Sequence, residues 1–225
     1  MPHRRALLFM LAAALCPASL SAKAAPGPVV TLLGDSITAG LGLPAGDALP
    51  ARLEAALRDL GVEARVRGAG VSGDTTGGAL ARLDFSVEPD TAVCVVELGA
   101  NDYLQSVPPA EVKANLLGII ARLKARHVAV VLAAGHAPRA GSGGYGREFD
   151  AVFRTAGRQP GVDLVPDLLG EVLTRPDLKQ ADGLHPNAAG VRRLAARLAP
   201  AVAAAVRRSA AAPAAARPPQ AVKGR

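Results

Sequence analysis

The sequence has very few aromatic residues and cysteines. Aromatic residues make up 3% of the 225 positions, tryptophan is absent, and the two cysteines are Cys16 and Cys94. Proteins that bind nucleic acids combine basic surfaces with aromatic side chains that stack on bases, so we do not expect nucleic-acid binding here. Cys16 falls in a signal peptide that we predict below, so Cys94 has no partner for an internal disulfide. Its valine-rich surroundings predict a buried, unreactive thiol.

Acidic residues are missing from both ends of the chain. The formal net charge is +7, but eight of the 26 basic residues lie in the first 24 or the last nineteen positions, and all 19 acidic residues lie between. Residues 25–206 therefore carry 18 basic and 19 acidic side chains and have no basic excess that would attract polyanions. The last segment, residues 207–225, is rich in alanine and proline and has no periodicity, so we predict a disordered basic tail.

The N-terminal hydrophobic run is too short to cross a bilayer. It covers residues 6–15, whereas a spanning helix needs about 20 apolar residues. Basic residues precede it and the sequence Ala22-Lys23-Ala24 follows it, which predicts a cleavable signal peptide over residues 1–24. We therefore expect a periplasmic or secreted protein that is not stably inserted in a membrane after cleavage.

Apolar runs alternate with amphipathic segments through residues 25–206, which is enough chain for one domain. Nearly continuous apolar runs are typical of parallel strands that are buried on both faces. We predict such strands at residues 29–33, 92–98, 128–134, 162–165 and, more weakly, 63–66. Helical periodicity appears at residues 48–60, 109–126 and 188–206. The pattern predicts an α/β fold, a three-layer α/β/α sandwich with a central, mostly five-stranded parallel sheet that is similar to flavodoxin.

Four polar segments follow the predicted strands or precede the last helix. In parallel sheets, functional sites form in the loops after the carboxyl ends of the strands, so these segments are candidates for one site. They are Gly34-Asp35-Ser36, residues 68–75 (GAGVSGDT), residues 99–102 (GAND) and residues 182–187 (DGLHPN).

These segments contain the groups that acyl transfer requires. A serine that attacks a carbonyl carbon needs a neutral imidazole to accept its proton, and the imidazole needs a carboxylate to orient it. Asp182 precedes His185 by three residues, a spacing that can place the carboxylate on Nδ1 and leave Nε2 for Ser36. The N–H groups of Ser36 and Gly73 and the side-chain amide of Asn101 can form an oxyanion hole. We therefore predict a serine hydrolase with Ser36 as nucleophile and His185 as base.

The four segments, in this order, resemble the SGNH (GDSL-like) hydrolase family, and in particular its bacterial thioesterase, lysophospholipase and arylesterase branch. The resemblance covers about residues 29–198 and makes Ser36, Gly73, Asn101 and His185 the four signature residues, with Asp182 completing the triad. It implies a secreted serine esterase that cleaves small or lipid-like carboxylic esters or thioesters through an acyl-enzyme intermediate. We expect no metal and no cofactor.

Two further positions bear on the substrate pocket. Tyr103 stands where related sequences often carry a small residue, and it either narrows the acyl pocket or caps the core. His136 follows the run at residues 128–134 and is a candidate pocket residue. The glycine-rich stretch at residues 134–144 lacks the Arg-Leu-Pro type of segment that the thioesterases carry, so the resemblance to them does not determine the substrate preference.

Alternative functions remain open from the sequence alone. Residues 68–73 also spell Gly-x-Gly-x-x-Gly, and Glu97 lies further along, as in a nucleotide-binding oxidoreductase. That interpretation leaves the other three segments unexplained. An acetyl-esterase that acts on carbohydrate is an alternative within the same family. An α/β-hydrolase needs a Gly-x-Ser-x-Gly elbow, which residues 70–74 lack.

Overall fold

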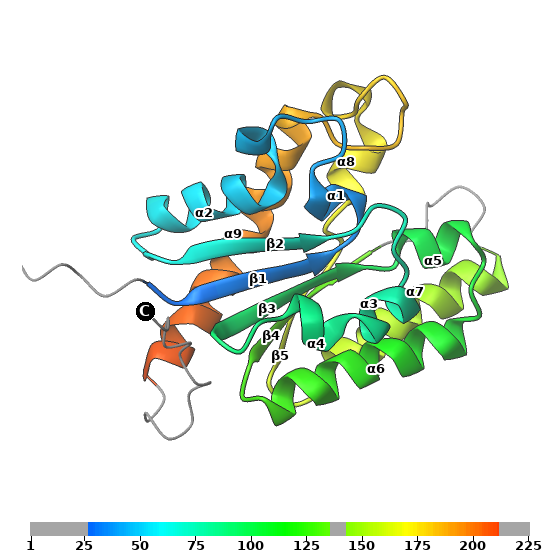
Figure 1. Ribbon diagram of the computed structural model, residues 1–225. Coiled ribbons are helices and arrows are strands. Elements are labelled where there is room, and N and C mark those ends of the chain that lie inside the picture. Colours follow the sequence, from blue (N-terminus) through cyan, green and yellow to red (C-terminus); the bar gives the residue numbers. More distant parts are fainter. Residues whose placement is uncertain (1–26, 136–142, 212–225) are drawn as a thin grey trace, which may run out of the picture.

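Five parallel strands form the central layer of the protein, in the order β2-β1-β3-β4-β5 (Figure 1). The computed structural model describes residues 27–135 and 143–211. The strands are β1 (Val29–Gly34), β2 (Arg65–Gly70), β3 (Thr91–Leu98), β4 (Ala129–Ala134) and β5 (Val162–Val165). The predicted five-stranded parallel sheet is thus confirmed.

Helices cover both faces of this sheet, which completes the three predicted layers. Figure 1 shows α2 and α9 on one face and α6 and α7 on the other. The helices are α1 (Ser36–Ala39), α2 (Leu49–Asp59), α3 (Thr76–Ala81), α4 (Leu83–Ser86), α5 (Ala100–Leu104), α6 (Pro109–Ala125), α7 (Gly144–Gly157), α8 (Gly170–Thr174) and α9 (Ala188–Ala211), with short 3-10 segments η1 (Ala45–Asp47) and η2 (Pro176–Leu178).

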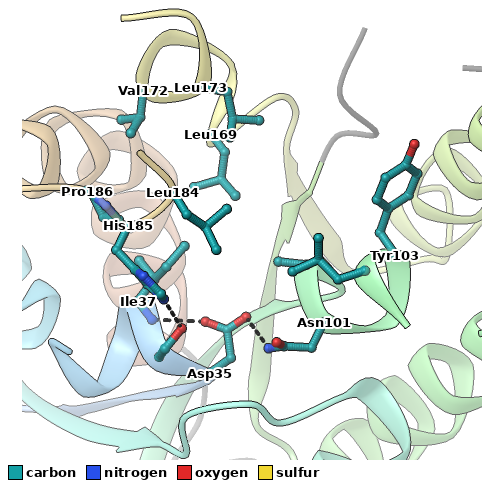
Figure 2. Close-up of a pocket in the computed structure, with 13 residues that line it drawn as sticks. Asp35, Ile37, Asn101, Tyr103, Leu169, Val172, Leu173, Leu184, His185 and Pro186 are labelled. Atoms are coloured by element: carbon teal, nitrogen blue, oxygen red, sulfur yellow. Dashed lines mark hydrogen bonds between the residues drawn. The ribbon is translucent and has the colours of Figure 1, made fainter. Parts of the chain in front are cut away.

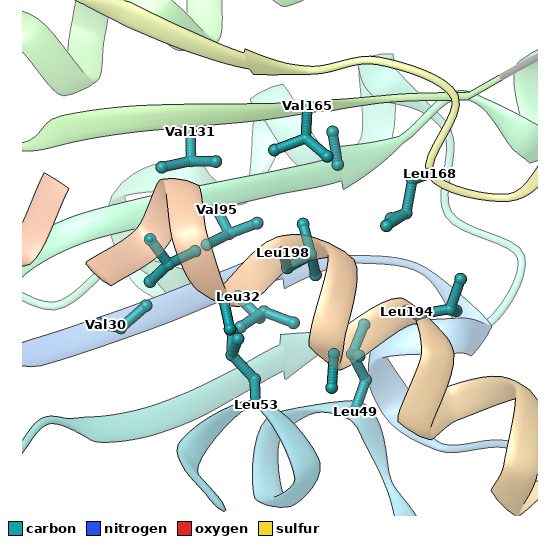
Figure 3. Close-up of a cluster of buried hydrophobic side chains, with 14 of the residues drawn as sticks. Val30, Leu32, Leu49, Leu53, Val95, Val131, Val165, Leu168, Leu194 and Leu198 are labelled. Atoms are coloured by element: carbon teal, nitrogen blue, oxygen red, sulfur yellow. The ribbon is translucent and has the colours of Figure 1, made fainter. Parts of the chain in front are cut away.

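Alternate side chains of each inner strand enter two different cores. In β3, Val93 and Val95 pack in the cluster under α2 and α9, whereas Cys94 and Val96 pack in the cluster under α6 and α7. Successive side chains of a strand point to opposite faces, so a strand covered on both sides must be apolar throughout. Figure 3 shows the first cluster, in which Leu198 of α9 lies over the sheet.

The buried position of Cys94 agrees with the prediction from sequence. Its side chain is fully buried in β3. Burial disfavours the charged thiolate and raises the pKa of the thiol to about 12. Since the thiolate is the reactive form, this cysteine is held in its unreactive state.

Strand β2 begins and ends later than the sequence pattern predicts. The expected strand at residues 63–66 is Arg65–Gly70, so residues 68–70, which we expected in a loop, complete the strand. Glycines interrupt the apolar pattern by which a strand is predicted, but the close packing of β2 against neighbouring helices requires them. A Cβ atom on Gly70 would lie 2.3 Å from the backbone nitrogen of Ala39 in α1.

Helix α9 is longer than predicted, and the expected start of the tail at residue 207 is wrong. Residues 207–211 continue the helix, and Arg207 donates a hydrogen bond of 2.9 Å to the Leu60 carbonyl oxygen. Arg208 forms an ion pair with Asp163. The predicted signal peptide and the rest of the predicted tail lie outside the described residues. Within the described ranges, no helix combines the length and apolar character needed to span a membrane.

The chain reverses its direction of strand addition at β1, which has β2 on one side and β3 on the other. Ligands of open α/β sheets bind at such a switch point, outside the carboxyl ends of the strands. Three of the four polar segments lie at the carboxyl ends of β1, β2 and β3 and continue into the chain that follows, so the fold brings them to the same edge of the sheet (Figure 1).

Candidate active site

Ser36 stands at the first position of helix α1, and Asp35 alone separates it from strand β1. Asp35 caps this helix, because its Oδ1 accepts a hydrogen bond of 2.9 Å from the Ile37 N–H. The turn from strand to helix is tight, since a Cβ atom on Gly34 would lie 2.1 Å from Thr38 Oγ1. This packing sets the direction of the Ser36 side chain, which lines the cleft described below.

His185 connects Ser36 to Asp182. Ser36 Oγ lies 3.0 Å from His185 Nε2, and His185 Nδ1 lies 2.6 Å from Asp182 Oδ2. A carboxylate on Nδ1 favours the tautomer that carries its proton there, which leaves Nε2 as the acceptor for the serine hydroxyl. The structure therefore brings together the three residues for which the sequence predicts these roles.

Backbone N–H groups hold Asp182 in its charged form. Asp182 Oδ1 accepts hydrogen bonds from the N–H groups of Leu184 (2.9 Å) and His185 (3.0 Å). These bonds, together with the bond to the His185 ring, lower the pKa of Asp182 to about 2. Asn187 anchors the same loop, since its Oδ1 accepts from the N–H groups of Ala189 and Gly190 at the start of α9.

Gly73 occupies a tight turn after strand β2. The Asp74 N–H donates to the Val71 carbonyl oxygen at 3.0 Å, and Gly73, the third residue of this four-residue turn, has a φ of 82°. A type II turn needs positive φ at this position and therefore favours glycine. Among the residues that the structure describes, none accepts a hydrogen bond from the N–H of Gly73 or from that of Ser36. Within the described residues, both donors are thus without a protein acceptor.

The Asn101 amide, by contrast, already has two acceptors. Its Nδ2 donates to the Asp74 carbonyl oxygen at 2.9 Å. It also donates to Asp35 Oδ2 at 3.2 Å (Figure 2). These bonds fix the side chain beside Ser36, but its N–H groups must turn partly from these oxygens to meet an oxyanion. The sequence pattern did not indicate the contact with Asp35.

Two buried carboxyl groups lie beneath the serine. Asp35 is 1% exposed, and burial is the main cause that raises its pKa to about 6. Glu97 is also buried, on β3, and accepts a hydrogen bond of 2.8 Å from Thr38 Oγ1. Burial and the nearby Asp35 carboxyl group raise the pKa of Glu97 well above its ordinary value. Glu97 thus braces α1 from below.

The position of Glu97 also removes the support for a nucleotide-binding site. The acid that binds a ribose in such sites lies on the strand next to the glycine-rich turn. Here β1 separates β3 from β2, and the Glu97 side chain is buried against Thr38. The first two glycines of the pattern, Gly68 and Gly70, lie within β2.

Asp102, in the third polar segment, forms hydrogen bonds with Thr76, the residue that follows the second segment. Its Oδ2 accepts from the Thr76 N–H at 2.9 Å, and its Oδ1 accepts from Thr76 Oγ1 at 2.6 Å. The Asp102 carboxyl group is completely buried. Because Asp102 follows Asn101 directly, these bonds hold the Asn101 loop beside the Gly73 turn.

An apolar cleft opens beside Ser36 and His185 (Figure 2). It encloses about 660 Å³ including its open mouth. Its apolar walls come from α1, α5, α8 and the His185 loop. The side chains that form them are Ile37, Tyr103, Leu104, Leu169, Val172, Leu173, Leu184 and Pro186. Sequence reasoning missed the contribution of α8, although the spacing of Leu169, Val172 and Leu173 is that of one helical face.

Tyr103 lines the cleft and also packs against the core. Its ring packs against Tyr145 and Phe149 at centroid distances of 5.5 and 5.3 Å. Phe149 continues the stack to Phe153 at 5.4 Å. Four of the five aromatic residues that the structure describes are thus packed together behind the Asn101 loop. The other candidate pocket residue, His136, lies outside the described residues.

Comparison with known proteins agrees with this geometry. The profile of the GDSL-like lipase/acylhydrolase family matches residues 32–193, which include every polar segment described above. The chain belongs to the GDSL-like lipase/acylhydrolase family. As a member of that family, it is an ester-hydrolysing enzyme.

Two curated relatives and one solved structure illustrate the similarity to GDSL-like hydrolases. Esterase TesA of Pseudomonas aeruginosa is 36% identical over 76% of this chain and 85% of its own length. The thioesterase 1/protease 1/lysophospholipase L1 of Escherichia coli K12 is 32% identical over 75% and 80%. The crystal structure of AlinE4, an SGNH-hydrolase family esterase, has a TM-score of 0.68 at 42% identity and covers 81% of this chain and 98% of AlinE4.

Proposed function

We propose that the protein is a serine esterase in which Ser36 attacks the acyl carbonyl carbon. His185 Nε2 accepts the serine proton as the Oγ–C bond forms, and Asp182 stabilises the imidazolium. The N–H groups of Ser36 and Gly73 and the Asn101 amide then stabilise the oxyanion. The observation that carries this proposal is the Ser36 Oγ to His185 Nε2 distance of 3.0 Å.

The second half of the reaction uses the same groups. His185 gives its proton to the leaving alcohol or thiol as the bond from carbon to the leaving group breaks. A water molecule then loses a proton to His185 and attacks the acyl-enzyme. The new tetrahedral intermediate collapses, and the carboxylic acid leaves as Ser36 recovers its proton.

The walls of the cleft support an apolar acyl group as the part of the substrate that is bound. Leu169, Val172 and Leu173 present only hydrocarbon beside the catalytic serine. Such a surface stabilises a bound alkyl or aryl chain by removing it from water. Two family relatives carry the names esterase and thioesterase/lysophospholipase, which supports carboxylic esters, thioesters and lipid-like esters as the substrate class.

Kinetics with chromogenic esters test this function. We expect Ser36→Ala and His185→Asn to abolish hydrolysis of p-nitrophenyl acetate, butyrate and octanoate while the proteins still fold, as judged by circular dichroism. His127→Asn is the matched control, because His127 precedes β4 at the opposite end of the strands and its positive φ of 57° suits asparagine. Near wild-type rates in Ser36→Ala or His185→Asn would refute the mechanism.

We further propose that the enzyme is exported to the periplasm or the medium. The support lies in the sequence of residues 1–24, with its basic start, short apolar run and Ala22-Lys23-Ala24 site. N-terminal sequencing of the protein made in a bacterial host should give Ala25 as the first residue, in the periplasmic or extracellular fraction. An uncleaved chain in the cytoplasmic fraction would exclude export.

A further inference from the structure

Arg82 contacts two of the four polar segments that meet at the active site, although it belongs to none of them. It lies between helices α3 and α4, and its guanidinium group reaches carbonyl oxygens of strands β1 and β2. Its Nε donates to Asp74 Oδ2 at 2.7 Å, its Nη1 to the Ala69 carbonyl oxygen at 2.9 Å, and its Nη2 to the Gly34 carbonyl oxygen at 3.0 Å.

The three acceptors lie close in sequence to the two backbone donors that the proposed mechanism uses. Ala69 precedes the turn that contains Gly73, and Asp74 ends it. Gly34 is the last residue of β1, two positions before Ser36. We propose that Arg82 is a positioning residue that holds the Gly73 turn against the nucleophile loop and so keeps the oxyanion hole in shape.

Arg82 also affects Asn101 indirectly. Arg82 fixes the Asp74 side chain, and the carbonyl oxygen of the same residue accepts the Asn101 Nδ2 hydrogen bond. If the guanidinium group is removed, the turn is released from one of its supports, and both the Gly73 N–H and the Asn101 amide are free to shift. Small displacements of such donors lower the stabilisation of the transition state more than the binding of the substrate.

The shape of the guanidinium group explains why an arginine stands here. Its nitrogens lie in one plane and donate in fixed, diverging directions, which suits a carboxylate and two carbonyl oxygens on two segments. The ammonium group of a lysine is a single point and cannot reach all three acceptors. The Arg82 side chain is 20% exposed and that of Asp74 is 10% exposed, so water screens the pair only in part.

Arg122 offers a matched control on the same face of the sheet. It also donates to one carbonyl oxygen, that of Leu80 at 3.2 Å, and to one carboxylate, that of Asp84. Its side chain is 47% exposed, and its two partners lie on α3 and α4, outside the polar segments. Loss of Arg122 therefore removes similar interactions without affecting the oxyanion donors.

The test compares Arg82→Met, Arg82→Lys and Arg122→Met, with kcat expressed per active serine counted by fluorophosphonate titration. This inference rests on the proposed function, so Ser36→Ala is measured alongside. We expect kcat on p-nitrophenyl acetate to fall at least tenfold in Arg82→Met, with KM changed less than threefold, and to fall less in Arg82→Lys. Arg122→Met should stay within twofold of wild type. Guanidinium chloride at millimolar concentration should restore part of the Arg82→Met rate.

A trifluoromethyl ketone supplies a readout that a merely structural role would not change. It adds to the serine and places an oxyanion in the hole, so its Ki should rise in Arg82→Met by the same factor by which kcat/KM falls. If kcat per active serine or this Ki matches that of Arg122→Met, the inference is wrong. If Arg82→Met does not fold, the same comparison with Arg82→Lys decides. Wild-type activity that survives Ser36→Ala would instead refute the proposed function.

Discussion

Substitution of Gly73 by alanine can test the oxyanion donor separately from backbone strain. The same substitution at a second glycine introduces similar strain away from the active site. Gly73 has a φ of 82° and Gly61, which follows α2, has a φ of 69°. At both positions a Cβ atom would meet no heavy atom within 4 Å. The Gly61 N–H donates to the Arg58 carbonyl oxygen, whereas we propose that the Gly73 N–H stabilises the oxyanion.

The expected changes in stability are therefore similar, and those in activity are not. Left-handed backbone costs a residue with a Cβ atom about 1–2 kcal/mol, so each variant should lose about that much unfolding free energy. In Gly73→Ala, relaxation of the turn rotates the N–H, and the methyl group enters the open space beside it. Loss of one oxyanion donor lowers kcat by about 100-fold to 1000-fold, so we expect a fall of about 100-fold in kcat/KM.

Urea unfolding and p-nitrophenyl ester hydrolysis measure the two quantities on the same preparations. Gly61→Ala should have a lower unfolding free energy and wild-type kcat/KM. In Gly73→Ala, both the unfolding free energy and kcat/KM should be lower than in wild type. Equal kcat/KM in the two variants would show that the Gly73 N–H takes no part in the reaction. A stability loss in Gly73→Ala that far exceeds the loss in Gly61→Ala would show that the methyl group is not accommodated as the structure indicates.

Three other predictions follow from single side chains. Asn101→Ala should lower kcat by about 100-fold or more with little change in KM, and a loss below threefold would contradict its role. Folded Glu97 keeps its proton at pH values where the unfolded chain has lost it, so thermal stability should fall as pH rises above about 4.5. Glu97→Gln should reduce this dependence of thermal stability on pH, and the control Glu54→Gln should not. Cys94 should react with a chromogenic disulfide reagent only after denaturation, and rapid reaction of the folded protein would contradict its burial.

The strands and the catalytic residues could be predicted from the sequence because their physical requirements leave simple patterns. Strand β3, apolar at nearly every position, could only be buried on both faces, and Asp182 and His185 are close enough in sequence to share one loop. The bounds of strand β2 were predicted incorrectly because its glycines are required by the close approach of α1. That tertiary contact leaves no periodic pattern in the sequence. Helix α7 was missed for a similar reason, since four glycines lie in or next to it.

Contacts between distant segments were beyond the reach of pattern analysis. The bond between Asn101 and Asp35 joins residues 66 positions apart, and that between Arg82 and Gly34 joins residues 48 positions apart. Neither pair has a spacing that any local motif encodes. The sequence indicated which residues perform the chemistry, but the residues that hold them in place became evident only once the strand order was known.

The proposed nucleophile can be tested most directly by covalent labelling. A fluorophosphonate reacts with a serine only when a neighbouring base activates it, and the adduct is stable enough to be located by peptide mass spectrometry. We predict one adduct per molecule, on Ser36, that forms at least 1000-fold more slowly in His185→Asn, since removal of one triad member costs about that much or more. An adduct on another serine, or equal labelling of Ser36 in His185→Asn, would contradict this mechanism.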